Sequence, residues 1–139
     1  MFGGVAPFAI VIAKHSRAKR IVSVELSREC SKYAQINIKR NKLADRVSET
    51  QGDVRRVVPK LREKFSRVVM ARPNLKDSFL DVGFKAVKRG GIIHYYGFYP
   101  EPEINKLKLL IIEEAKKEGK KIKILRIVKA GDIGVRKWR

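Results

Sequence analysis

The sequence predicts an α/β fold with a mostly parallel sheet and helices on both of its faces. Short runs rich in β-branched residues alternate along the chain with longer stretches of helical spacing, which is the pattern of βαβ units. The run Val68–Met70 is apolar throughout, as in a strand that is covered on both faces. A length of 139 residues suits one domain, and we expect a single domain over residues 1–139.

The first half of the chain opens with a glycine turn and then alternates helices with strands. In chain order we expect a helix from Pro7, a strand over 21–26, a helix over 28–41, a strand over 46–51 and a short helix or turn over 54–61. Pro7 suits a first helical turn, because that position leaves its backbone N–H unused in any case. Ser27 is expected to cap the second helix, and Pro59 interrupts the last segment.

The second half continues the alternation. In chain order we expect a strand over 67–71, a helix after Asp77, a strand over 92–98, a helix over 104–118 and a strand over 121–128. Asp77 is expected to cap its helix, and the pair Gly90-Gly91 to end it. Gly119 ends the long helix, after prolines at 100 and 102 have separated it from the preceding strand.

Charge is the strongest feature of the composition. The chain carries 33 Lys and Arg against 14 Asp and Glu, a net charge of +19, and both halves share the excess. A compact domain with such a charge is typical of nucleic-acid binding, because Lys and Arg neutralise phosphates. The alternative is the Lys- and Arg-rich surface of a thermophilic protein, although such surfaces usually balance the two signs.

Other features exclude whole classes of protein. No apolar run approaches the length of a membrane-spanning helix, and we expect no membrane partner. The single cysteine, Cys30, excludes an internal disulfide framework and a multi-cysteine zinc site, so we expect no metal. A reducing compartment fits this cysteine usage, and with no signal peptide the expected location is the cytoplasm.

Two features near the start of the chain suggest a nucleotide-like ligand. Gly3-Gly4 permits a tight turn and a close approach of backbone N–H groups to a ligand, although a plain strand–helix turn would need the same residues. Glu25 ends the predicted strand 21 residues after Gly4. An acidic residue at this spacing is placed to accept hydrogen bonds from ribose hydroxyls, whereas the simpler alternative is a solvated strand end.

Two further loops belong to the same predicted edge of the sheet. Asp53 follows the end of one strand. Its carboxylate could accept a hydrogen bond from an exocyclic amine such as that of adenine, or else it caps the helix that follows. The segment Ala71–Pro73 leaves the next strand. Because open parallel sheets bind ligands outside the carboxyl ends of their strands, Glu25, Asp53 and this segment are expected at one site.

Several segments together resemble one known family, the archaeal and eukaryotic tRNA (guanine-37-N1)-methyltransferases. The segments are Phe2–Phe8, Ile21–Leu26, Asn41–Arg46, residues 52–55, Arg67–Pro73 and residues 90–96. The similarity covers nearly the whole chain, and Gly-Gly-Ile-Ile-His-Tyr-Tyr is its most distinctive piece. It implies a Rossmann-like class I fold that binds S-adenosylmethionine and methylates N1 of the guanine beside the anticodon of tRNA.

The resemblance also implies roles for individual residues. Phe2, Gly3, Gly4, Val5 and Pro7 would wrap the methionine part of the cofactor. Glu25 and Leu26 would hold the ribose and flank the adenine, Asp53 and Val54 would lie at the adenine edge, and Ala71 and Pro73 would face the target guanine. His94 and Tyr95 lie on a predicted central strand, where packing is the simpler role than catalysis.

Two departures from the family pattern bear on catalysis. The family has an Asn-Leu-Pro turn where this chain has Ala71-Arg72-Pro73, and alanine cannot hydrogen-bond the guanine edge. Arg72 is the candidate replacement, or else it contacts tRNA phosphate. The proposed general base of the family, a glutamate, would lie upstream of Met1.

Three functions follow from this resemblance. The main expectation is a tRNA methyltransferase domain, and the alternatives are the related aminocarboxypropyl transferase of wybutosine biosynthesis and a non-catalytic, basic RNA-binding remnant. The family fold also leads us to expect a chain cut at both ends, without its first and last strands. Unpaired strand edges would then favour a homodimer or a strand exchange, or else leave the domain marginally stable.

Overall fold

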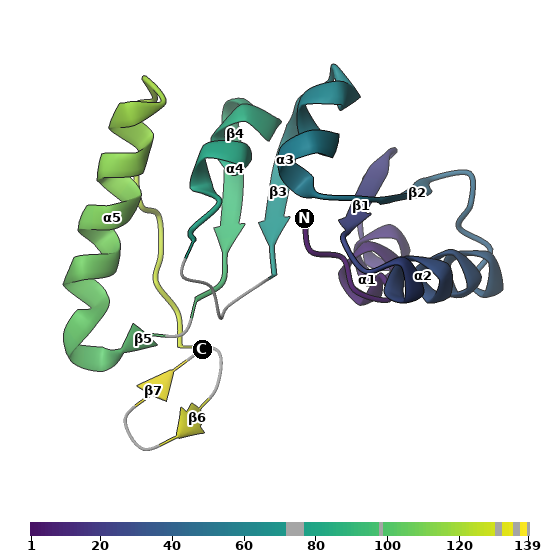
Figure 1. Ribbon diagram of the computed structural model, residues 1–139, viewed down its shortest axis with the longest axis horizontal. Helices are drawn as coiled ribbons and strands as arrows, with labels where there is room; N and C mark the ends of the chain where they lie inside the picture. The colour runs from purple at the N-terminus through teal and green to yellow at the C-terminus, as the bar shows by residue number, and fades with distance from the viewer. Residues whose placement is uncertain (72–76, 98, 130–131, 135–136, 139) are drawn as a thin grey trace. The chain divides into compact units, whose positions relative to one another are not determined.

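A computed structural model describes residues 1–71, 77–97, 99–129, 132–134 and 137–138. The chain divides into two compact units, Met1–Glu63 and Lys64–Arg139, and each is described by itself (Figure 1). The prediction of one domain over residues 1–139 therefore stays a prediction. Within the described ranges, no helix is both long enough and apolar enough to cross a membrane.

The first unit is built on two parallel strands. The elements are α1 (Pro7–His15), β1 (Ile21–Glu25), α2 (Arg28–Arg40), β2 (Val47–Gln51), α3 (Val54–Val57) and the 3₁₀ turn η1 (Val58–Leu61). The two strands pair in register from Ile21 opposite Val47 to Glu25 opposite Gln51, with α2 as the crossover between them. The sequence predicted the start of α1, and both ends of the other elements, to within about one residue.

Local signals explain where these elements begin. Pro7 occupies the first turn of α1, and the Ser27 hydroxyl caps α2 by accepting a hydrogen bond from the Cys30 N–H at 3.2 Å. Helix α2 has Glu29 in its first turn and two basic residues in its last, which complements the helix dipole. Pro59 lies in η1, where the α-helical path of α3 gives way to a tighter turn.

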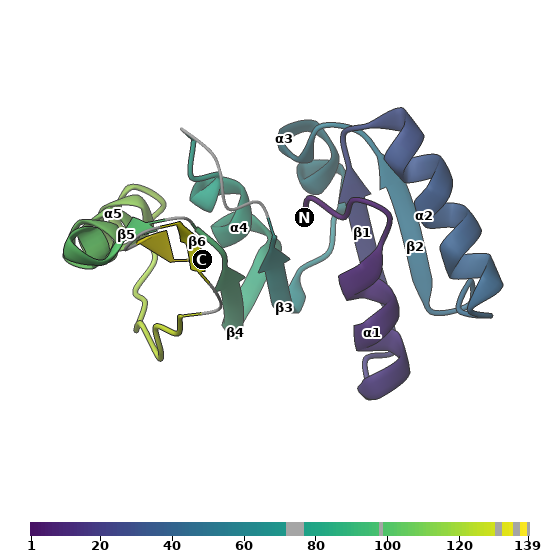
Figure 2. The ribbon, with the colours of Figure 1, turned by 90° about the horizontal axis from the view of Figure 1, so that it is seen from below.

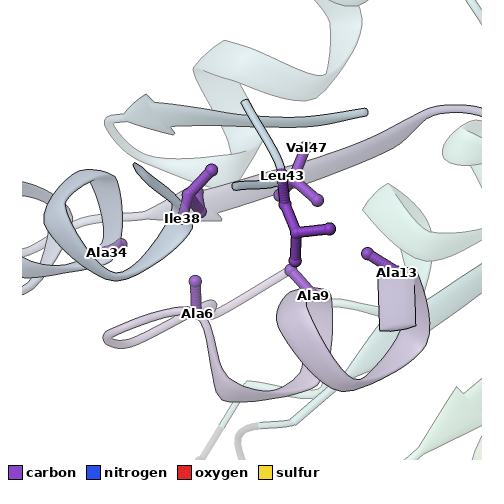
Figure 3. Packing of buried hydrophobic residues seen from close by; sticks show 7 residues of the cluster. All are labelled: Ala6, Ala9, Ala13, Ala34, Ile38, Leu43 and Val47. Carbon is purple, nitrogen blue, oxygen red and sulfur yellow. The ribbon is translucent and has the colours of Figure 1, made fainter. Parts of the chain in front are cut away.

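The core of this unit lies where α1 and α2 pack against the strands (Figures 2 and 3). The buried cluster consists of Ala6, Ala9, Ala13, Ala34, Ile38, Leu43 and Val47. Four of these residues are alanines, and small side chains let the helices pack closely against the strands. This packing fixes the start of α1, and therefore the glycine turn that precedes it, against β1.

The second unit also has a parallel strand pair, formed by β3 (Phe65–Met70) and β4 (Val87–Tyr95). The other elements are α4 (Leu80–Ala86), β5 (Tyr99–Pro100), the 3₁₀ turn η2 (Glu101–Glu103), α5 (Ile104–Lys117), β6 (Asp132–Gly134) and β7 (Lys137–Trp138). The last three strands form a small antiparallel sheet in the order β5-β7-β6. The parallel pairs and the crossover helices confirm the predicted α/β class.

The predicted boundary at Gly90-Gly91 is wrong, because α4 ends at Ala86 and β4 begins at the next residue. The two glycines lie inside β4, where the register with β3 shifts between Phe65 and Arg67. Gly90 has a φ of +73°, and a Cβ on Gly91 would come within 2.9 Å of the Lys88 carbonyl oxygen. The pair therefore forms an irregularity within the strand rather than a helix end.

Two other expectations in this unit need correction. The backbone N–H of Phe79 donates to Asp77 Oδ1 at 3.0 Å, but the residue that caps α4 is Phe79, so Asp77 shapes the turn before the helix. The predicted strand over 121–128 is wrong, since these residues form no regular element. Its apolar side chains stay exposed, with 65% of Leu125 and 55% of Val128 accessible, so the segment lacks the covering layer that a strand needs.

Candidate functional site

The glycine turn before α1 is folded against the end of β1. The N–H of Gly3 donates to the Val24 carbonyl at 2.9 Å, and the N–H of Ala6 donates to the Gly3 carbonyl at 2.9 Å. Phe2, Gly4 and Ala6 all have left-handed backbone angles, with φ of 61°, 54° and 69°. Two of them carry side chains, so the turn stores backbone strain of the kind that concentrates at ligand-binding sites.

Glu25 joins this turn to the end of β1. Its Oε2 accepts a hydrogen bond from the Gly4 N–H at 2.8 Å, and its Oε1 accepts one from the Ser27 N–H at 2.9 Å. The two residues that the sequence paired at a spacing of 21 are therefore in direct contact. Each carboxylate oxygen retains acceptor capacity, because an ionised carboxylate can accept about four hydrogen bonds. The side chain can hold the turn and also accept donors from a ligand.

Asp53 acts as the helix cap that the sequence left open as an alternative. Its Oδ1 accepts from the Arg55 N–H at 2.8 Å at the start of α3. The N–H of Gly52 donates to the Glu25 carbonyl at 2.8 Å, so the ends of β1 and β2 are tied together. Glu25 and Asp53 thus share one edge of the strand pair, as predicted.

The other predicted cofactor residues of this unit differ in exposure. Val54 is buried, whereas 58% of Leu26 is accessible, as is 41% of Val5. Pro7 is also exposed and Phe2 is half-buried. An exposed leucine next to Glu25 offers an apolar surface to a flat ring, whereas Val54 contributes only its backbone and its packing.

Asn37 is a site residue that sequence reasoning missed. Its Nδ2 donates to the Val5 carbonyl at 3.1 Å and so holds the glycine turn from the side of α2. The only signal was an asparagine in the middle of a helix, where its side chain ordinarily disfavours the helical conformation. Such a residue is explained once its amide bonds another part of the chain.

Replacing Asn37 with alanine should loosen the turn without unfolding the unit. The lost hydrogen bond is worth about 1 kcal/mol, while alanine regains most of that through its higher helix propensity. We expect the backbone N–H groups of Gly3 and Gly4 to exchange with solvent about fivefold faster at nearly unchanged global stability. Asn41→Ala is the matched control, because Asn41 Nδ2 donates to the Asn37 carbonyl within α2 instead of to the glycine turn. Unchanged exchange at both glycines would contradict this role.

The remaining predicted residues belong to the second unit. Ala71 is half-buried and directly follows β3, whereas Arg72 and Pro73 lie outside the described residues. His94 and Tyr95 lie on β4, opposite Val69 and Met70 of β3. Burial, together with the neighbouring Tyr99, raises the pKa of the Tyr95 hydroxyl, so this group stays protonated and polar at neutral pH.

Basic side chains are exposed along the length of α2, the helix that begins at this edge. Arg28, Lys32, Lys39 and Arg40 are all exposed on α2. A ligand that combines phosphates with flat rings would suit such a surface. Three groups could hold a small ligand: the glycine turn, Glu25 and the loop at Asp53. They lie together at the carboxyl ends of β1 and β2.

Comparison with known proteins shows which family has this sequence and fold. A family model described as the TRM5/TYW2 methyltransferase domain matches residues 1–125. The tRNA (guanine(37)-N(1))-methyltransferase Trm5b of Pyrococcus abyssi is 36% identical over 126 residues, which is 90% of this chain and 36% of that protein. The tRNA(Phe) (4-demethylwyosine(37)-C(7)) aminocarboxypropyltransferase of Methanocaldococcus jannaschii is 35% identical over 69% of this chain and 37% of its own length.

Solved structures show the same similarity. The structure of M. jannaschii TYW2 in complex with AdoMet superimposes with a TM-score of 0.87 at 29% identity, over 99% of this chain and 62% of that one. A complex of aTrm5 with tRNALeu contains a chain that matches with a TM-score of 0.80 at 28% identity, over 99% of this chain and 37% of that one. The chain therefore spans less than two thirds of the length of these relatives.

Proposed function

The chain belongs to the TRM5/TYW2 methyltransferase domain family, and from this premise we propose that it transfers a methyl group from S-adenosylmethionine to N1 of guanine 37 in tRNA. The observation that carries the proposal is the bond from the Gly4 N–H to Glu25 Oε2 at 2.8 Å. It joins a strained glycine turn to an acidic strand end, which is the pair of groups that a methionine-linked nucleoside requires.

The first unit offers a fitting group to each part of the cofactor. The backbone of Phe2–Pro7 would surround the methionine part, and the remaining lone pairs of Glu25 would accept hydrogen bonds from the ribose hydroxyls. Leu26 would cover one face of the adenine, and the loop at Asp53 and Val54 would border its edge. When bound, the cofactor supplies an electrophilic methyl group on a positively charged sulfur, which leaves as a neutral thioether.

The second unit supplies the groups that we assign to the guanine. Ala71, Arg72 and Pro73 follow β3, and we propose that this segment faces the base. Arg72 would hydrogen-bond the guanine or a neighbouring phosphate, since Ala71 offers no side-chain donor or acceptor. Guanine N1 carries a proton that must leave as the methyl group arrives, so methyl transfer requires a general base within hydrogen-bond reach.

The proposed partner is tRNA, bound over the basic surface. A net charge of +19 and the four exposed cations of α2 support phosphate contacts. The single cysteine fits a reducing compartment, and we place the reaction in the cytoplasm. Binding to tRNA should weaken steeply as salt increases, because phosphate contacts release counterions. A salt-independent affinity, measured by filter binding or fluorescence anisotropy, would exclude this mode of binding.

Product analysis separates methyl transfer from its nearest alternative. The chain is incubated with tRNA and S-adenosylmethionine, and the modified nucleoside is identified by mass spectrometry. A mass gain of one CH₂ on guanosine 37 supports methyl transfer, whereas the gain of an aminocarboxypropyl group would assign the chain to the activity named for the M. jannaschii relative. Saturable tRNA binding with no S-adenosylmethionine binding by calorimetry would instead indicate an RNA-binding domain without catalysis.

A further inference from the structure

Three polar side chains whose oxygen atoms are shielded from solvent lie together beneath the glycine turn. They are Ser23 on β1, Ser31 on α2 and Glu49 on β2, and we call them the turn floor. Ser23 and Glu49 are direct neighbours in the strand register. The two hydroxyl oxygens and both carboxylate oxygens are closed off from solvent. The two serine hydroxyls are hydrogen-bonding neighbours of the carboxylate but carry no charge to neutralise it, so a carboxylate shielded from solvent at this place calls for an explanation.

The turn floor touches the backbone of the glycine turn. A Cβ placed on Gly3 would overlap the hydroxyl oxygen of Ser23, so the turn rests directly on this side chain. Side chains two residues apart on a strand share a face, and Glu25 therefore lies on the same face as Ser23. Two carboxylates, those of Glu25 and Glu49, accordingly approach the turn from the same side.

The charge of Glu49 has few groups to balance it. Burial raises the pKa of its carboxyl, and the neighbouring carboxylate of Glu25 adds to this effect. The hydroxyls of Ser23 and Ser31 and the amino group of Met1 act in the opposite direction. Ionised Glu49 is therefore an anion that costs stability in the folded chain and would gain from a nearby cation.

We propose that Glu49 is a specificity-determining residue that acts through the glycine turn and favours the cationic cofactor over its neutral product. The inference rests on the proposed function, which places the methionine part of S-adenosylmethionine on this turn. The reactant carries a positive sulfonium, and S-adenosylhomocysteine carries an uncharged thioether at the same position. An anion beneath the turn attracts the first and not the second, so loss of the methyl group weakens binding and eases product release.

Calorimetry with both ligands tests the proposal on the full chain. For Glu49→Gln we expect the affinity for S-adenosylmethionine to fall on the order of tenfold and that for S-adenosylhomocysteine by less than about twofold. Glu29→Gln is the matched control, because Glu29 is exposed on α2 and its replacement removes the same charge. This control should leave the ratio of the two affinities unchanged.

The outcomes separate this inference from the proposed function. A wild-type chain that binds both ligands, with a ratio that Glu49→Gln leaves unchanged, overturns the role of Glu49 alone. A wild-type chain that binds neither ligand overturns the proposed function and this inference with it. Equal losses for both ligands in Glu49→Gln would show that the turn floor is only a structural support.

A pH series gives a second readout. The preference of the wild-type chain for S-adenosylmethionine should decline as pH falls through the raised pKa of Glu49, because protonation removes the charge, while Glu49→Gln shows a flat ratio. The stability of the ligand-free chain should change in the opposite direction. A raised pKa in the folded state means that stability is lost as pH rises, so Glu49→Gln should unfold at a higher temperature near neutral pH and lose this gain in acid.

Discussion

Replacing Glu25 with alanine is expected to weaken S-adenosylmethionine binding by about 100-fold, a larger effect than that of any other single carboxylate of the first unit. The carboxylate accepts from the N–H groups of both Gly4 and Ser27, and in the proposed complex it also accepts from the ribose. Hydrogen bonds to a charged group are each worth about 1.5–3 kcal/mol, and about 2.7 kcal/mol corresponds to 100-fold in affinity.

Two controls make this expectation specific. Glu25→Gln retains one acceptor oxygen and should lose only part of the affinity, because its amide cannot accept from both N–H groups. Methylthioadenosine has the ribose but lacks the amino-acid part and the sulfonium, and Glu25→Ala should weaken its binding as well. Calorimetry supplies the affinities, and circular dichroism verifies the fold. Binding by Glu25→Ala within about threefold of wild type would remove Glu25 from the site.

The agreement between prediction and structure is best where a local signal and a spacing coincide. Ser27 caps α2 because a hydroxyl before an amphipathic stretch satisfies a free helical N–H. Gly4 and Glu25 meet because a parallel strand pair with a short first helix brings that spacing to one edge. These relations depend only on chain geometry, and they are therefore visible in a sequence.

Residues inside regular elements were harder to assign. Asn37 lies within α2 and Glu49 lies in the middle of β2. The hydrophobic periodicity of the sequence does not distinguish such positions from ordinary surface or core residues. Their roles depend on which segment packs against them, and that is settled only in three dimensions. The role of Asn37 follows from its bond to the Val5 carbonyl, and the role proposed for Glu49 follows from the burial of its oxygens.

The wrong strand over 121–128 has a related cause. Its first four residues, Lys121 to Ile124, alternate lysine with isoleucine, which is the pattern of a half-buried strand. A strand also needs a neighbour to accept its backbone hydrogen bonds, and a sequence pattern does not specify one. Gly90-Gly91 posed the same difficulty, because a glycine pair ends a helix or bulges a strand according to its partners.

Replacing Gly3 with alanine should be the most damaging small substitution in the glycine turn. The new methyl group would overlap Ser23 Oγ, whose residue is only 4% exposed. Overpacking of this kind costs about 1–3 kcal/mol, and the shift of the turn should reduce S-adenosylmethionine affinity by at least about tenfold. Denaturant unfolding and calorimetry measure the two effects separately.

The neighbouring glycine and Ser23 provide the controls. Gly4 has a φ of +54°, and a Cβ there would meet nothing within 4 Å, so Gly4→Ala pays only the cost of a left-handed alanine, about 1–2 kcal/mol. In Gly3→Ala with Ser23→Ala, the nearest remaining atom is the Cβ of residue 23 at 3.4 Å, which is ordinary contact. The double variant should therefore recover most of the lost stability. If it does not, the clash with Ser23 is not what makes Gly3 necessary, and its backbone contact with Val24 becomes the remaining explanation.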